Sequence, residues 1–202
     1  ENYRLRTLSG EANLPAKPEY DKEILRMKKL SENTKALFFL WLLIFISSLL
    51  VFRRFLFGDE LAVFKDVGSD TIQQYLMQYD SIINAIRDGN LSLWDFTNGF
   101  GTSVYALNLF HPLLFLLYLA GAVVGPAHLP SLMVFFEIGQ IFLAATVAFF
   151  YLQEFHFSAR TKILAAYLYG FNGYLLVWGQ HYQFGLFVIL LPLLLLLAER
   201  SV

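Results

Sequence analysis

Two aspartates, Asp66 and Asp70, stand four residues apart in the stretch that follows the first apolar run of the chain. A carboxylate can take the proton from a reacting hydroxyl, and several carboxylates together can hold a divalent cation. Two carboxylates alone are a weak metal signal. Asp70 also precedes an amphipathic segment, with Gln73 three residues further on, which is the spacing of a capping box. The pattern therefore predicts either a general base or a helix cap at Asp70. Asp66 is the second candidate for the base, and it could instead be a ligand of a divalent cation.

Glu137 is an ionisable residue well inside an apolar run. A helix entered at Ser131 carries it about 9 Å into the apolar layer, where a carboxyl is costly unless it faces a cavity or a partner. Gln140 falls on the same face, three residues later. The pair could have a functional role, in which it orients the acceptor substrate or the catalytic aspartate. It could instead form a hydrogen bond that packs two helices.

Three further side chains suit binding. Arg53 and Arg54 follow the first apolar run, where guanidinium groups could hold a phosphate bidentately or could extend to lipid headgroups. His181 lies in a short turn between Trp178 and Gln183. This turn could line an acceptor site, or it could be an interfacial polar turn.

Aromatic residues alternate with polar ones at Trp94, Phe96 and Phe100, and Gly99 and Gly101 allow backbone turns there. An aromatic face beside hydrogen-bonding groups can stack on the CH face of a sugar, which makes Trp94 a candidate substrate-binding residue. An aromatic belt at a membrane interface has the same composition, so both interpretations remain open.

The segment between Asp70 and Gly89 is predicted to be an amphipathic helix of about 17 residues. Its apolar residues recur at three- and four-residue intervals, and Gly89 supplies a left-handed stop. Such a helix suits the membrane interface, where it would hold Asp70 at the bilayer surface. The apolar positions are Ile72, Tyr75, Leu76, Tyr79, Ile82, Ile83 and Ile86.

The composition defines the class of protein. Of the 202 residues, 57% are hydrophobic and 15% are charged, with a formal net charge of −1. A nucleic-acid binder would need a positive excess, and a disordered chain would need low hydrophobicity. The lack of cysteine excludes disulfides, thiolate metal sites and cysteine nucleophiles. We therefore expect an integral protein of the lipid bilayer, with no nucleic-acid partner.

We predict an all-α membrane protein. A segment at 1–35 holds eight of the fifteen Lys and Arg residues, so it is predicted to be cytoplasmic by the positive-inside rule. A membrane module follows at 36–202. It is predicted to contain four transmembrane helices, at about residues 36–57, 131–152, 162–178 and 183–198.

The long loop at 58–130 is predicted to lie outside the cell, because it holds two cations against seven acids. Its apolar piece at 109–124 is predicted to be an arm in the outer interface or packed on the bundle. If it crossed the membrane instead, Arg160 and Lys162 would face outward, against the positive-inside rule.

Four short motifs follow one another along the outer loop. In this order and spacing they resemble the YfhO family of bacterial membrane proteins, over roughly residues 36–200. The family usually has Asp where this chain has His111. Because family members are much longer and this chain begins with Glu1, we expect the N-terminal part of such a protein. The motifs are Gly68-x-Asp70-x-x-x-Gln74, Arg87-x-Gly89-x-x-x-x-Trp94, Gly99-x-Gly101 and His111-Pro112-Leu113.

The YfhO family is similar to the GT-C membrane glycosyltransferases, so the resemblance implies a GT-C-like module in a bacterial cell membrane. Those enzymes have a catalytic Asp in the first outer loop and take sugar from a polyprenyl-phosphate carrier. The resemblance thus implies that Asp70 is the base and that Gln73 and Gln74 help bind substrate. The acceptor would be a cell-surface glycopolymer such as lipoteichoic acid. No cofactor is implied beyond a divalent cation that Asp66 could ligate.

Two other classes remain as alternatives. A lipid or polysaccharide transporter would contain inverted repeats and broken helices, and no repeat is visible in the sequence. A non-catalytic scaffold whose outer loop binds polysaccharide would need no base at Asp70.

Overall fold

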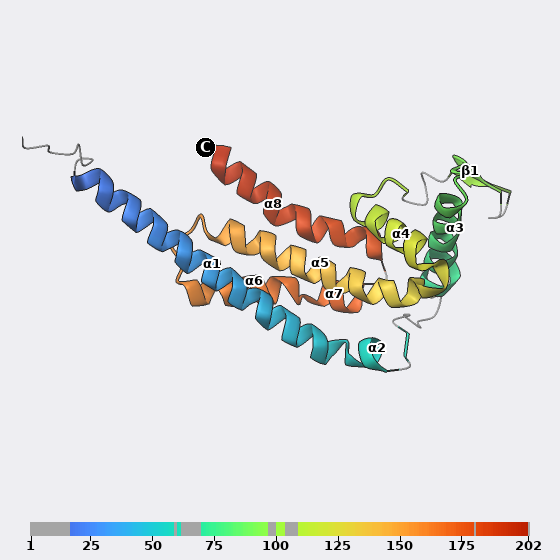
Figure 1. Ribbon diagram of the computed structural model, residues 1–202, viewed down its shortest axis with the longest axis horizontal. Helices are drawn as coiled ribbons and strands as arrows, with labels where there is room; N and C mark the ends of the chain where they lie inside the picture. The colour runs from blue at the N-terminus through green and yellow to red at the C-terminus, as the bar shows by residue number, and fades with distance from the viewer. Residues whose placement is uncertain are drawn as a thin grey trace, which may run out of the picture.

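The computed structural model describes residues 17–58, 60–61, 70–96, 100–103, 109–179 and 181–201. Long helices run side by side along the molecule, and shorter elements gather at one end (Figure 1). Asp66 and Gly99 lie outside the described residues.

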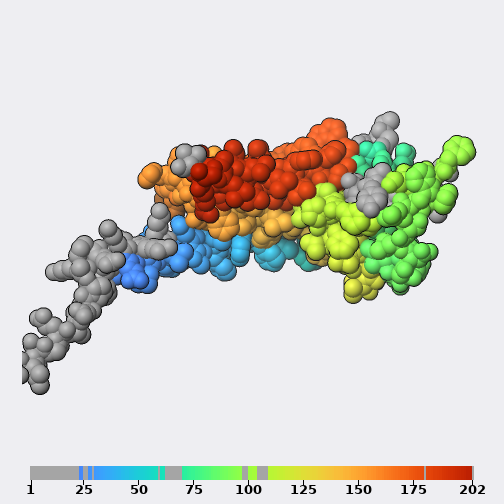
Figure 2. Space-filling model, turned by 90° about the horizontal axis from the view of Figure 1, so that it is seen from above, coloured from blue at the N-terminus to red at the C-terminus, as the bar shows by residue number. Residues whose placement is uncertain are grey.

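The bundle is built from helices whose directions alternate. α1 spans Lys17–Val51, α5 spans Leu129–Leu152 and α8 spans Gly185–Ser201, while α6 (Ala159–Gly170) and α7 (Gly173–Val177) connect α5 to α8. α1 and the α6–α7 pair run toward the end with the short elements, and α5 and α8 run away from it (Figure 1). α8 covers one face of the bundle (Figure 2).

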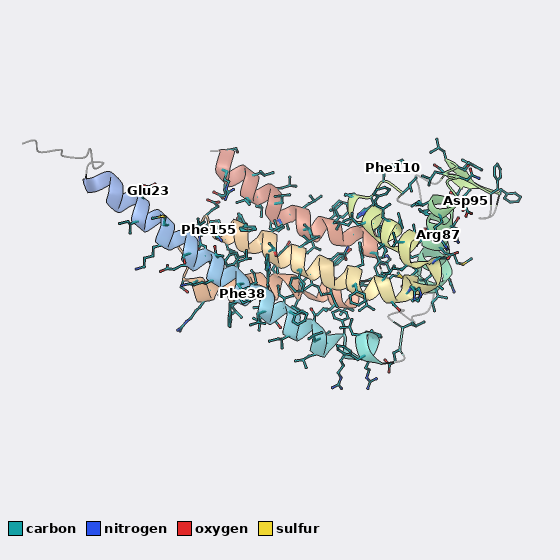
Figure 3. The ribbon with its side chains drawn as sticks, viewed as in Figure 1. Glu23, Phe38, Arg87, Asp95, Phe110 and Phe155 are labelled. Carbon is teal, nitrogen blue, oxygen red and sulfur yellow. The ribbon has the colours of Figure 1, made fainter. Side chains whose placement is uncertain are left out.

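The short elements form the other part of the molecule. α3 lies across the end of the bundle rather than along it (Figure 1). Arg87 and Asp95 mark this end, and Glu23 lies at the opposite one (Figure 3). In chain order the elements are α2 (Arg53–Phe57), a π-helical turn η1 (Thr71–Tyr75), α3 (Leu76–Arg87), β1 (Trp94–Asp95), β2 (Thr102–Ser103), α4 (Pro112–Val124), and the 3-10 turns η3 (Pro126–His128) and η4 (Tyr182–Phe184).

Three of the described helices are long and apolar enough to cross a membrane: Leu30–Val51, Pro126–Leu152 and Tyr182–Ser201. The span predicted at 36–57 therefore begins earlier and ends at Val51. The chain turns at Phe52, with φ −94° and ψ 13°, and continues as the separate helix α2. α4, within the predicted arm, is a shorter apolar helix.

The span predicted at 162–178 is divided into α6 and α7 at Asn172. The Asn172 Nδ2 donates a hydrogen bond to the Tyr169 carbonyl at 2.6 Å, and its Oδ1 accepts one from the Leu175 N–H at 3.0 Å. One side chain thus binds the last turn of α6 and caps the first turn of α7. The apolar pattern predicted a continuous helix because it gives no weight to a single capping residue.

Polar side chains join the long helices. Trp41 donates to the Thr146 hydroxyl at 2.9 Å, and the Ser47 and Tyr167 hydroxyls are 2.9 Å apart. Because lipid offers few hydrogen-bond partners, such contacts favour one arrangement of α1 against its neighbours. The adjoining core contains Leu40, Ile44, Val134, Ile141, Ala144, Ala145, Phe149, Ala166 and Ile189.

The predicted amphipathic helix is present as η1 followed by α3, and Gly89 ends it with φ 65°. Most of its apolar face packs against protein, since Tyr79 and Ile83 lie in one core cluster with Leu117 and Tyr118 of α4, while Ile72 is exposed. The predicted capping box is wrong. Asp70 has helical angles of φ −61° and ψ −29°, and its side chain makes no capping hydrogen bond.

A small β-hairpin also departs from the all-α prediction. Trp94 pairs with Ser103 and Asp95 pairs with Thr102 in antiparallel register. Gly101 has φ 101°, and a Cβ at this position would collide with the Trp94 indole. The pairing therefore depends on a left-handed glycine close to an aromatic ring. The two-residue strands are too short for a period-2 pattern to predict.

Gly170 is predicted to be essential for the packing of α6 on α5. A Cβ at this position would lie 2.8 Å from the Ala145 Cβ and 2.9 Å from the Ile141 carbonyl oxygen. Gly170→Ala should therefore lower the stability by about 1–3 kcal/mol through overpacking. Thermal unfolding in detergent measures this change. Gly139→Ala is the matched control, because a Cβ there meets nothing within 4 Å, and equal destabilisation of the two variants would contradict the packing argument.

Candidate functional site

The start of the η1–α3 helix and the turn between α7 and α8 meet at the end of the bundle. The Asp70 Oδ2 lies 4.0 Å from the His181 Nδ1, and the two side chains are 42% and 22% exposed. This separation allows an ion pair if His181 is protonated, but it is too long for a hydrogen bond. The structure thus brings together two predicted site residues that are 111 positions apart in the sequence.

Tyr75 connects the two sides of this site. Its hydroxyl lies 2.9 Å from the His181 Nδ1 and accepts a hydrogen bond from the Gln183 Nε2 at 3.1 Å. Burial raises the pKa of the Tyr75 phenol, and the neighbouring Asp70 carboxylate adds to this shift, against the opposing effect of Gln183. Tyr75 is therefore a neutral phenol with a proton available for a hydrogen bond.

His111 holds the turn from the side of α4. Its Nδ1 accepts a hydrogen bond from the Leu114 N–H at 3.1 Å, so the side chain caps α4. Its Nε2 lies 2.9 Å from the Gln183 carbonyl oxygen. Burial lowers the pKa of His111, although the backbone hydrogen bonds act in the opposite direction. Capping needs a hydrogen-bond acceptor, which the His111 Nδ1 provides here.

α5 contributes a polar face beneath the same turn. The Gln140 Nε2 donates to the Tyr182 carbonyl at 2.8 Å. Gly185 makes this approach possible, because a Cβ there would collide with the Gln140 amide. The Gln140 side chain therefore packs α5 against the turn before α8 through a hydrogen bond, which is one of the two roles that the sequence predicted for the Glu137–Gln140 pair.

Glu137 is 5% exposed, and both of its carboxylate oxygens lack a hydrogen-bond partner among the described residues. A Cβ at Gly179 would lie 2.8 Å from its Oε1. Glu137 thus faces the α7–α8 turn from inside the protein. A buried carboxyl without a partner is destabilising, so its position next to the site is not explained by packing.

Aromatic rings surround the polar groups. The His181 ring stacks on Trp178, with 5.7 Å between centroids and 15° between planes. Tyr75, Tyr79, Tyr118 and Tyr182 pack against one another in the cluster that joins α3, α4 and η4. These rings hold the Asp70 end of the η1–α3 helix against the turn.

Within the described part of the chain, Trp94, Arg53 and Arg54 make no hydrogen bond or ion pair with this cluster, whereas Gln73 and Gln74 lie on the same element as Tyr75. Trp94 is at the far end of α3, in the hairpin, where Ser81, Ile82, Ala85 and Asn90 line a groove of about 170 Å³ beside it. The exposed Arg54 pairs with Glu60 at 3.3 Å, next to the exposed Arg53. Gln73 and Gln74 are exposed on η1, close to Asp70.

Three residues of the cluster were not singled out in the sequence. Tyr75 looked like one apolar position of an amphipathic helix, Gln183 like a residue of a polar turn, and His111 like a departure from a motif. The available signal was the hydroxyl that Tyr75 carries within the apolar stripe, because buried tyrosines usually find a hydrogen-bond partner. Among the described residues, no group of three or more His, Asp or Glu could hold a metal ion.

The helices and the polar end cluster define a helical membrane protein with a site at one end of its bundle. A family model described as bacterial membrane protein YfhO matches residues 36–201. The chain therefore belongs to the YfhO family, as its motifs indicated. No curated protein and no solved structure gives a match.

His111 predicts how the stability of the protein depends on pH. Since the folded state lowers the pKa of His111 below its usual value of 6.5, the unfolded chain binds more protons in the interval between the two values. The free energy of unfolding should therefore fall as the pH drops below 6.5, with a slope of at most about 1.4 kcal/mol per pH unit from this residue.

Chemical unfolding at a series of pH values measures this slope. His111→Asn is the matched variant, because Asn keeps a capping acceptor but does not titrate. Its slope should be smaller over the same pH interval. An unchanged slope would show that another group is responsible.

Proposed function

We propose that the protein is an extracytoplasmic glycosyltransferase of the cell membrane, in which Asp70 is the general base. The observation that carries the proposal is the position of Asp70. Its carboxylate is accessible, does not cap the helix, and lies beside His181 at one end of the membrane bundle. Membership of the YfhO family supports the same function through the similarity of that family to the GT-C enzymes.

The proposed donor is a sugar on a polyprenyl phosphate, and the proposed acceptor is a hydroxyl of a cell-surface glycopolymer such as lipoteichoic acid. Asp70 takes the proton of the acceptor hydroxyl while the oxygen of that hydroxyl bonds to the anomeric carbon of the sugar. The bond from that carbon to the phosphate oxygen breaks, and its electron pair leaves with the polyprenyl phosphate. Asp70 then releases the proton to water. Arg53 and Arg54 are the proposed contacts for the phosphate, as cations able to bind it bidentately.

The proposed topology has four crossings, with α6 and α7 together forming the third. Asn33 of α1 bonds to Gln153, and Arg200 pairs with Glu154, so Arg160 and Lys162 lie at the same end of the bundle as the basic start of α1. Because cations gather at this end of the bundle, the positive-inside rule supports a cytoplasmic location for this end. The Asp70 site then faces outward.

The break at Asn172 favours a second class of function, because interrupted helices are a feature of transporters. A transporter would move its substrate without transferring a sugar. The two functions are therefore separated by the loss or retention of glycosyl transfer.

Asp70→Asn tests the base directly. Because Asp70 makes no capping bond, the variant should fold and reach the membrane normally. It should reduce sugar incorporation into the surface polymer by about 10²–10⁴-fold, the usual contribution of a general base. The sugar content of the polymer, measured in cells with matched protein levels, gives the result. Asp88→Asn, an exposed carboxylate at the other end of the same helix, should leave incorporation unchanged. Full incorporation with Asp70→Asn would rule out this function for Asp70.

Cysteine labelling tests the topology, since the chain has no cysteine of its own. A cysteine at His156, between α5 and α6, should react with a membrane-impermeant maleimide only after the cells are permeabilised. A cysteine at the exposed Asn90 should react in intact cells. Labelling at position 156 in intact cells would overturn the four-crossing arrangement.

A further inference from the structure

A groove of about 170 Å³ lies between the last turns of α3 and the hairpin, at the other end of the helix from Asp70. The Ser81 hydroxyl of α3 donates a hydrogen bond to the Asp95 Oδ2 of β1 at 3.4 Å, which joins the two walls. Pockets that enclose a whole drug-sized ligand have volumes of about 300–1,000 Å³, so this groove suits a single ring. Its lining includes Ser81, Ala85, Asn90, Trp94, Asp95 and Phe96.

Two aromatic rings are accessible at this groove. Trp94 is 46% exposed and Phe96 is 77% exposed, with 6.4 Å between the ring centroids. The indole of Trp94 packs against Gly101, where a Cβ would collide with the indole nitrogen. The backbone of Trp94 is fixed by its pairing with Ser103. The indole is therefore a fixed apolar surface that a ligand can reach.

The position of the hairpin favours a ligand in water over lipid. β1 lies beyond α3, at the end of the molecule opposite the start of α1 (Figure 1). Surfaces that bind anionic lipids are rich in Lys and Arg, whereas the described residues that line the groove include neither and include the acidic Asp95. The exposed rings are therefore better explained by a water-soluble ligand than by a membrane interface.

The groups in the groove match the chemistry of a neutral sugar. The CH face of a sugar ring is apolar and can pack on the indole of Trp94, while the hydroxyls of the ring need donors and acceptors. The exposed Asn90 amide can supply both, and the Asp95 carboxylate can accept. A phosphate would be repelled by Asp95 and would meet no cation among the described lining residues.

The distance from Asp70 shows that the groove is not the place of transfer. Ala85 follows Asp70 by 15 positions on the η1–α3 helix, so a rise of 1.5 Å per residue separates the two by about 20 Å. A single sugar is too small to reach both positions. A polymer can reach both, because they lie on one helix at the same end of the bundle.

We propose that this groove is a glycan-binding subsite that holds a neutral sugar already attached to the acceptor polymer. The inference rests on the proposed function, in which Asp70 helps to transfer sugars to a surface polymer. A polymer that stays bound at the groove remains at a high effective concentration near Asp70 after each transfer. The groove thus retains the glycosylated polymer between successive transfers.

Tryptophan fluorescence tests whether the groove binds a glycan. The chain has three tryptophans, so Trp41→Phe combined with Trp178→Phe leaves Trp94 as the reporter. The purified protein is kept in a detergent without a sugar headgroup. The emission of Trp94 should change with at least one of four neutral tetrasaccharides, made of glucose, N-acetylglucosamine, galactose or mannose. No change with any of the four overturns the proposal.

Two variants test whether the glycan occupies the groove itself, with calorimetric titration of the tetrasaccharide that binds. Ala85→Phe fills the groove from the α3 wall and should weaken binding at least about tenfold, as should Trp94→Ala, because buried aromatic contacts dominate such interfaces. Trp94→Phe keeps a ring and should weaken binding less. Met77→Phe is the matched control, because Met77 is exposed on α3 outside the groove, and it should bind normally. Normal binding by Ala85→Phe contradicts the assignment to this groove.

Brominated lipids test the membrane alternative. In vesicles of phosphatidylcholine, acrylamide in the water should quench the emission of Trp94, and bromine atoms on the acyl chains should not. Quenching by the brominated lipid instead would place the hairpin in the bilayer and overturn the proposal.

These binding measurements require no sugar transfer, so they fail independently of the proposed function. In cells, Ala85→Phe should lower the number of sugars on each polymer chain without abolishing transfer. If the tetrasaccharide binds but Asp70→Asn retains full incorporation, the groove is a glycan site in a protein that is not a transferase of this kind. If Asp70→Asn abolishes incorporation and no glycan binds, the transferase stands without this subsite.

Discussion

A glutamine within an apolar helix must find a hydrogen-bond partner, and the rest of the site depends on where Gln140 finds one. Its amide donates to the Tyr182 carbonyl at 2.8 Å, across a gap that only a glycine at position 185 leaves open. An unsatisfied amide in this environment is destabilising. The contact therefore holds the α7–α8 turn against α5, and with it the ring of His181.

The same turn is held from two other directions. His111, which caps α4, bonds to the Gln183 backbone, and Tyr75 of η1 accepts from the Gln183 side chain. The amphipathic helix is consequently held by protein contacts on its apolar face and by hydrogen bonds at its start. This explains why Asp70 is not needed as a cap and why its carboxylate remains accessible beside His181.

Several features could be predicted from the sequence because they depend on local or compositional properties. The amphipathic helix follows from apolar residues at helical spacing, and its end follows from Gly89, which adopts the left-handed conformation. The family follows from motifs that are contiguous in the sequence. The division of the predicted third span at Asn172 was missed, because hydropathy sums over many residues and a cap is a single hydrogen-bonding side chain.

The site shows the same contrast. Asp70 and His181 were both candidates, but the 4.0 Å between them and the hydrogen bonds that Tyr75 makes with His181 and Gln183 arise from elements far apart in the chain. The sequence by itself determined a membrane-embedded helical chain of the YfhO family and the residue types available for chemistry, since composition, period and motifs are properties of the chain alone. Only the tertiary structure decided which side chains meet and that Asp70 does not cap its helix, because hydrogen-bond partners are selected by the packing of α3, α4 and α5 around the turn.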